Sequence, residues 1–211
     1  MLKTGKTKIK VFLLVIGMMT AGSLAATRAM AGITGSDHDF STESWNTTGQ
    51  TCVVCHTPHN ANSGVTPLWN HATTTSAFTV YTSPSLDAVV GQPSASSKAC
   101  LSCHDGTVAL DSFGGNTGST TMTGDHNLGT DLVNDHPISF SFNTALATAD
   151  GGLHDPATAN SGLGGTINDD LLLGGKMECA SCHDVHNSSN LPKLLVKSNA
   201  SSALCFTCHS K

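Results

Sequence analysis

The stretch Cys179-Ala-Ser-Cys-His-Asp-Val-His-Asn187 decides how this chain is built. Its first five residues follow the pattern Cys-x-x-Cys-His, which recurs in copies beginning at Cys52, Cys100 and Cys205. In this spacing, two thiols can add across the vinyl groups of one haem, and the histidine that follows can bind its iron. The four copies therefore predict four covalently attached haem c groups.

The four pentapeptides use every cysteine of the chain. The predicted haem-attaching cysteines are Cys52, Cys55, Cys100, Cys103, Cys179, Cys182, Cys205 and Cys208, and the predicted proximal iron ligands are His56, His104, His183 and His209. Four disulfides, two zinc sites or redox-active dithiols are the alternative interpretations of eight cysteines in such pairs. None of these alternatives accounts for a histidine after every pair.

Two of the copies are longer than the others. The stretch from Cys52 to Asn60 has the form C-x-x-C-H-x-x-H-N, as does the stretch at Cys179, and a plain copy follows each of them. This order favours two related two-haem submodules, at about 32–130 and 150–211, within a tetrahaem domain over 32–211.

The N-terminus has the pattern of an export signal. Lysines precede an apolar run over 11–20 that is too short to span a membrane, and Ala29-Met-Ala31 is typical of a cleavage site. We expect residues 1–31 to be a Sec signal peptide, with a retained N-terminal anchor as the alternative. No second apolar run of membrane length follows, so no stable membrane span is expected after the signal is removed.

Removal of the signal makes the chain acidic. Five of the ten basic residues lie within 1–31, which leaves five against fifteen acidic residues and a formal net charge of −10. Such a charge disfavours nucleic acid as a partner.

The composition is poor in residues that form a core. Aromatic residues make up 5% of the chain, and stretches such as 114–124 and 157–165 lack apolar periodicity. Buried porphyrins could supply the missing hydrophobic stabilisation. The expected fold is therefore mostly irregular coil with short helices and few or no strands, wrapped around a stack of four haems.

Seven histidines lie outside the pentapeptides: His38, His59, His71, His126, His136, His154 and His186. They outnumber the four irons, whereas methionine is scarce after residue 31. Two histidine ligands on each iron would leave no open position for a substrate, which favours electron transfer over catalysis. We therefore expect bis-histidine haems and no enzymatic activity.

His59 and His186 each lie three residues after a proximal histidine. On a continuing helix, each would lie on the same side of the haem as that proximal ligand and could not reach its far face. Each would therefore bind the iron of another haem, in the same chain or in another subunit. The alternative is a surface residue.

His71 and His136 are the other two predicted distal ligands. His71 follows Pro67 and Trp69, which could hold its segment against a flat apolar surface. His136 precedes an alternating apolar stretch that could form a short strand, and Asp135 or a backbone carbonyl could accept its ring N–H.

His38 is a further possible distal ligand. It lies between two aspartates near the start of the mature chain, where it could bind a neighbouring subunit's haem or stay exposed. His126 and His154 lie in Gly- and Asp-rich loops and are expected to be exposed.

Six stretches in order resemble the multihaem cytochromes with doubled C-x-x-C-H motifs from metal-reducing bacteria, in particular extracellular tetrahaem cytochromes that polymerise into conductive filaments. These stretches are Ser36-Asp-His-Asp-Phe40, Cys52–Asn60, Pro67-Leu-Trp-Asn-His71, Cys100–Ala109, His136-Pro-Ile-Ser-Phe140 and Cys179–Asn187. The resemblance implies an outer-surface protein, bis-histidine haems in a continuous line, and one distal histidine from the adjacent subunit. By this analogy His59 would cross to a neighbour, at the haem of His209, although His38 could do the same.

Three function classes follow. The first is long-range electron transport through a head-to-tail homopolymer, a nanowire that takes electrons from redox donors to metal oxides, electrodes or cells. The second is a monomeric electron shuttle in the periplasm or at the outer surface. The third, a multihaem reductase, is disfavoured because all four motifs carry histidine and further histidines are in surplus.

Overall fold

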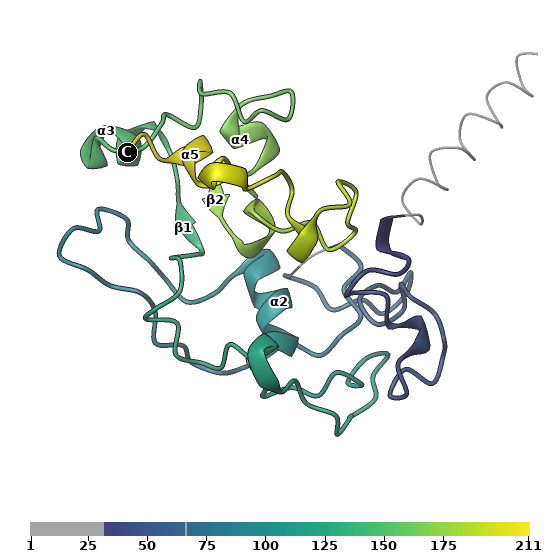
Figure 1. Cartoon of the computed structure of the whole chain (residues 1–211). Helices are drawn as coiled ribbons and strands as arrows, with labels where there is room; N and C mark the ends of the chain where they lie inside the picture. Colours follow the sequence, from purple (N-terminus) through teal and green to yellow (C-terminus); the bar gives the residue numbers. More distant parts are fainter. Residues whose placement is uncertain (1–31, 66) are drawn as a thin grey trace, which may run out of the picture.

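The computed structural model describes residues 32–65 and 67–211. The predicted signal peptide lies outside these residues. The described chain is mostly irregular, with short helices and one small two-stranded sheet, which confirms the expected fold class (Figure 1).

The regular elements are all short. In chain order they are η1 (Phe40–Thr42), α2 (Ala95–His104), η2 (Gly124–His126), β1 (Phe140–Ser141), α3 (Thr144–Asp150), α4 (Ile167–Asp170), β2 (Lys176–Met177), η3 (Cys179–Ser181), η4 (Pro192–Leu194), η5 (Ala200–Ser202) and α5 (Cys205–Cys208), where η marks a 3-10 helix.

Helix α2 is central in the molecule (Figure 1). It follows Pro93 and an extended Ser94, and it buries Ala99 and Leu101. Its C-terminal half is the second Cys-x-x-Cys-His copy, and η3, which begins the third copy, packs against it. The fold therefore brings two attachment sequences together that are far apart in the chain.

Strands β1 and β2 pair antiparallel, with Phe140 opposite Met177. The short strand that the sequence suggested after His136 is present as β1. Around this pair lies a core of buried apolar side chains: Phe140, Phe142, Ala147, Ile167, Leu171, Leu172 and Met177. A smaller cluster consists of Phe78, Leu101 and Leu132.

Side-chain caps hold the helices around this core. Asn143 accepts a hydrogen bond from the Leu146 N–H at the start of α3, which ends at Gly151 in the left-handed conformation. Thr166 and Asp169 form a reciprocal capping box on α4. These local signals explain how ordered structure forms in a Gly-, Ser- and Thr-rich sequence.

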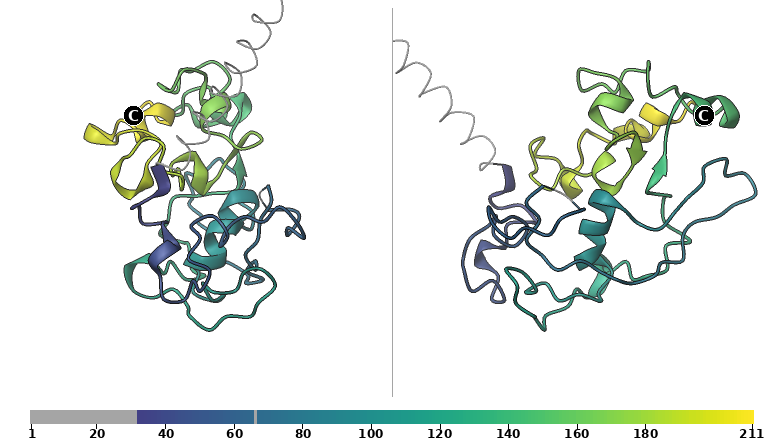
Figure 2. Two further views of the ribbon diagram at one scale, coloured as in Figure 1. Left: turned by 90° about the vertical axis from the view of Figure 1, so that its right-hand side faces the viewer. Right: turned by 180° about the vertical axis from the view of Figure 1, so that it is seen from behind.

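The N-terminal segment of the described chain and the C-terminus lie on opposite sides of the molecule (Figures 1 and 2). Within the described residues, none of the helices combines the length and the apolar character that are needed to cross a bilayer.

Candidate haem-binding sites

Each Cys-x-x-Cys-His copy forms a single helical turn. The histidine N–H donates to the carbonyl of the first cysteine at 2.9 Å in the first copy, 3.1 Å in the third and 2.9 Å in the fourth, and the second copy lies in α2. One such turn places both cysteines and the histidine on the same side of the backbone. All eight cysteines are free, as covalent attachment of haem requires.

The helix does not continue beyond the proximal histidine in either long copy. Asn60 and Asn187 instead adopt left-handed conformations, with φ of 56° and 52°, so the chain turns back. Asparagine tolerates this conformation better than most residues do. The geometry of a continuing helix therefore does not apply to His59 and His186.

In the first long copy, the returning chain is fixed on both sides of His56. The Thr57 N–H donates to the Leu68 carbonyl at 2.9 Å, and the Asn70 N–H donates to the Cys55 carbonyl at 2.9 Å. We call residues 52–70 the first hook.

The third copy forms a second hook, over residues 179–196. The Asp184 N–H donates to the Leu194 carbonyl at 2.6 Å, and the Val196 N–H donates to the Cys182 carbonyl at 3.0 Å. Leu194 has a φ of 56°, and its counterpart Leu68 has a φ of 58°. The internal repeat therefore covers more of the chain than its nine-residue sequence motif.

The hooks also orient the proximal histidines. The Nδ1 of His56 lies 3.2 Å from the Pro67 carbonyl, and that of His183 lies 2.9 Å from the equivalent Lys193 carbonyl. In the second copy, the His104 Nδ1 lies 2.7 Å from a backbone carbonyl. An Nδ1–H that donates to a carbonyl leaves the Nε2 lone pair free for a metal, the usual arrangement for a metal-binding histidine.

Three proximal histidines lie beside a histidine from outside the motifs. The ring centroids are 6.2 Å apart for His38 and His104, 6.1 Å apart for His56 and His186, and 6.3 Å apart for His136 and His209.

These separations fit a bis-histidine haem. A metal–imidazole bond is about 2.0 Å long and the ring centre lies roughly 1.1 Å farther out, so two rings on opposite faces of one iron have centroids about 6.2 Å apart. The histidine pairs therefore fit the cofactor that the cysteines would hold.

The pKa shifts in two of these pairs favour neutral rings. Burial, with a smaller contribution from His104, lowers the pKa of His38 to about 4. Burial and the neighbouring His136 lower the pKa of His209. A neutral imidazole is the form that binds a metal. The buried Nδ1 of His38 also has no hydrogen-bond partner.

The remaining proximal histidine, His183, is exposed, and no ring pair of this kind contains it within the described part of the chain. His59 is also exposed. At His209, where the resemblance implied His59 of another subunit, the ring partner is His136 of the same chain. His126 and His154 are exposed, as expected.

His71 is placed differently from the other predicted ligands. It is buried, its Nδ1 lies 2.7 Å from the Ala72 carbonyl, and its Nε2 lies 3.0 Å from the Ala109 carbonyl and 3.8 Å from the Cys103 sulfur. Both ring nitrogens are thus engaged by the protein. Its distal role stays a prediction.

The attachment cysteines of the first two copies adjoin each other. Burial raises the pKa of the Cys55 thiol to about 11. Burial and the nearby Cys55 raise that of Cys103 to about 12. Both residues are half-buried.

The cysteines of the second and third copies also interact, as do those of the third and fourth copies. A thiol–thiol hydrogen bond raises the pKa of Cys100 and lowers that of Cys179, because Cys100 is the donor. Burial and the nearby Cys205 raise the pKa of Cys182. The four attachment sites thus form a series of neighbours from the first copy to the fourth.

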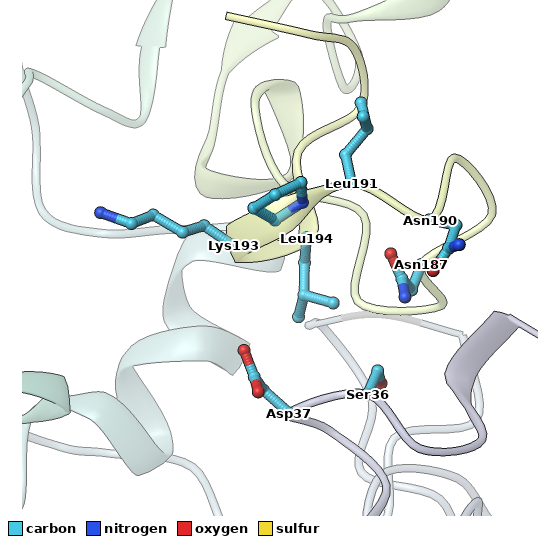
Figure 3. Close-up of a pocket in the computed structure, with 8 residues that line it drawn as sticks. Ser36, Asp37, Asn187, Asn190, Leu191, Lys193 and Leu194 are labelled. Atoms are coloured by element: carbon cyan, nitrogen blue, oxygen red, sulfur yellow. The ribbon is translucent and has the colours of Figure 1, made fainter.

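A cavity of about 320 Å³ separates the segment before His38 from the second hook (Figure 3). Its lining residues are Ser36, Asp37, Asn187, Asn190, Leu191, Pro192, Lys193 and Leu194. Within residues 32–65 and 67–211, no group of three or more His, Cys, Asp or Glu side chains could hold a metal ion without the porphyrin.

The C-terminal part of the chain matches a known protein family. Residues 173–211 match a family described as the doubled CXXCH motif, and this segment contains the second hook and the fourth copy. No curated protein matches the chain. Covalent haem c is the cofactor of this motif. Residues 173–211 therefore have the doubled CXXCH motif, and the chain carries the signature of a multihaem c-type cytochrome, which implies electron transfer.

Proposed function

We propose that the protein is a tetrahaem cytochrome with histidine on both faces of every iron, which polymerises into an extracellular conductive filament. The observation that supports this best is the set of three histidine pairs at the spacing of two ligands on one iron. Irons with two protein ligands have no open position for a substrate, so the proposal includes no enzymatic activity.

The proposed axial pairs follow these contacts: His104 with His38, His56 with His186, and His209 with His136. When bound, each haem supplies one-electron redox chemistry. The chain holds it through two thioethers and two imidazoles, and the proximal rings of the first three copies are oriented by backbone carbonyls.

The neighbouring attachment sites support a continuous line of haems. Electrostatic interactions between cysteine side chains link the first copy to the second, the second to the third and the third to the fourth. Electrons would enter at one end of this series and leave at the other.

Polymerisation is supported by the position of the remaining ligand. His183 has its Nδ1 on a carbonyl but has no ring pair of this kind within the described chain, and His59 is exposed. We propose that His59 of an adjacent copy completes the haem at His183. The wide separation of the two ends of the described chain suits a head-to-tail contact, which forms a filament when it does not close.

This assembly corresponds to the resemblance to the filament-forming tetrahaem cytochrome OmcE. It requires export, so we propose an outer-surface location with residues 1–31 as the signal peptide. Metal oxides, electrodes or other cells would be the terminal acceptors. A monomeric shuttle in the periplasm or at the surface is the alternative.

The test compares His59→Ala with the matched control His154→Ala, which also changes an exposed loop histidine. Electron microscopy and low-temperature electron paramagnetic resonance are applied to the haem-loaded proteins. We expect filaments with only low-spin haems in the wild type and the control. The His59 variant should give discrete particles and one haem that has lost its low-spin signal. Filaments and a full set of low-spin signals in the His59 variant would refute the cross-copy ligand.

The axial pairs within the chain need a separate measurement. His186→Ala should convert one haem from low to high spin in the monomeric His59→Ala background, whereas His126→Ala, in another exposed loop, should convert none. Discrete wild-type particles with four low-spin haems would instead establish the monomeric shuttle.

A further inference from the structure

The molecule buries two carboxylates beside haem attachment sites. Among the described residues, Asp105 and Glu178 are the acidic side chains that are buried, with 4% and 1% of their surface exposed, and no lysine or arginine is buried with them. Asp105 directly follows His104, and Glu178 directly precedes Cys179. Burial of a carboxylate costs free energy unless a neighbouring group compensates its charge.

The protein partners of Glu178 are neutral. Its Oε1 accepts a hydrogen bond from the Ser94 hydroxyl at 3.0 Å, and its Oε2 accepts one from the Ser139 hydroxyl at 2.9 Å. The Lys176 ammonium donates to the Ser94 hydroxyl at 3.5 Å and so lies near the carboxylate. These contacts satisfy the oxygen atoms of Glu178 but compensate its charge only in part, because within the described residues it forms no ion pair.

Glu178 also lies where the second and third attachment sites meet. The Cys179 N–H donates to the Ser97 hydroxyl of α2 at 2.9 Å, and the side chains of Cys179 and Cys100 interact. Glu178 therefore lies next to the first haem-attaching cysteine of the third copy, close to the second copy.

We propose that Glu178 sets the reduction potential of the haem attached at Cys179 and Cys182. Reduction adds one electron, from a neighbouring haem or another one-electron donor, and changes ferric iron to ferrous iron without a proton or a leaving group. A fixed negative charge in the interior stabilises the more positive ferric form, and so it lowers the potential. The proposal requires haem at the third copy but does not depend on filament formation.

The size of the effect follows from the Coulomb energy. At an effective dielectric constant of about 20, a unit charge changes the oxidised-to-reduced ratio of a redox centre roughly tenfold across about 12 Å, and by more at shorter range. A tenfold change corresponds to about 59 mV for a one-electron couple.

Glu178→Gln removes the charge while keeping a carbonyl that can accept a serine hydrogen bond. The matched control is Glu43→Gln, because Glu43 is the other glutamate of the chain and is exposed. Both haem-loaded variants are compared with the wild type by spectroelectrochemical titration, with electron paramagnetic resonance to check that every haem keeps its ligands. In the Glu178→Gln protein, we expect the oxidised-to-reduced ratio of one haem to fall about tenfold at a given applied potential. The control should show no change.

If Glu178 served only as a structural clamp between Ser94 and Ser139, loss of the clamp alone would change the potential as Glu178→Gln does. Ser139→Ala breaks the clamp but keeps the charge, which is then less screened, so it should lower the same potential or leave it unchanged. A rise in Ser139→Ala equal to that in Glu178→Gln would overturn the proposal. So would a Glu178→Gln protein with its ligands intact and its titration unmoved, or a shift of all haems by the same amount. If Glu178→Gln does not fold, the direction of the Ser139→Ala shift alone decides.

Discussion

Replacement of Ile167 by alanine tests whether side chains, and not haems alone, hold the C-terminal half together. Ile167 is 0% exposed and packs in the core with Phe142 and Leu171, each of which is 2% exposed. Truncation of a fully buried isoleucine costs about 2–5 kcal/mol, because the lost burial adds to the cost of the cavity. Since these neighbours are themselves fully enclosed, we expect about 3 kcal/mol, within that range.

For a chain of this size, each kcal/mol lowers the melting temperature by about 2–4 °C, so the expected fall is roughly 6–12 °C. Circular dichroism of the haem-loaded protein during heating measures it. Leu163→Ala is the control, because Leu163 is 45% exposed on the loop before α4. A melting temperature within about 2 °C of the wild type for Ile167→Ala, or an equal fall in the control, would refute the reasoning.

Three further predictions concern loops and caps. A backbone N–H from Gly35, followed by nearby hydroxyls, lowers the pKa of Asp39 to about 2 from 3.8. The stabilising contribution of Asp39 is therefore complete above about pH 4 and is lost as the pH falls towards 2, so Asp39→Asn should flatten the wild-type fall in melting temperature between about pH 5 and 2. Gly106 has a φ of 71°, and an added Cβ would meet the Asn127 side chain, so Gly106→Ala should lower the free energy of unfolding in urea by about 1–3 kcal/mol. Thr166→Ala removes the capping box of α4 and should cost about 1 kcal/mol in the same assay, whereas Thr166→Ser should keep most of the stability.

The fold class could be predicted from sequence because it depends on local features. The haem-attaching motifs depend on the spacing of a few neighbouring residues. The irregular segments follow from the local abundance of Gly, Ser and Thr and the scarcity of aromatic residues. β1 at Phe140 likewise follows an alternation that is visible in the sequence. The core around Ile167 was not predicted, because its members come from four separate short elements and loops.

The full extent of the two hooks was also missed. The sequence motif ends at Asn60 and Asn187, whereas the structural repeat continues to the segments around Leu68 and Leu194. The left-handed conformations and the backbone hydrogen bonds make these segments equivalent, although most of their side chains differ. A shared leucine near a proline, in Pro67-Leu68 and in Pro192-Lys-Leu194, was the available signal.

Pairing of the histidines depends on contacts that are distant in sequence. From the sequence, His38 could be either a ligand or an exposed residue, and His71 was the stronger candidate for a distal ligand. In the structure, the ring of His38 lies beside that of His104, while both ring nitrogens of His71 contact the protein. Which histidine meets which cannot be derived from spacing, because irregular segments determine it.

The near-parallel rings of His56 and His186 belong to positions about 130 residues apart, and in the proposed cytochrome this separation would order haem maturation in time. A chain exported N-terminus first would present Cys52 and Cys55 for haem attachment long before His186 followed. The first haem would then be attached early but would receive its proposed second ligand only after residue 186 had emerged. Closing so large a ring costs little more than closing a small one, since each doubling of loop length adds only about 0.6 kcal/mol. In that proposed arrangement, a chain that ended before the second hook would keep its first haem with an incomplete ligand set, and completion of that haem would report that synthesis had passed the second hook.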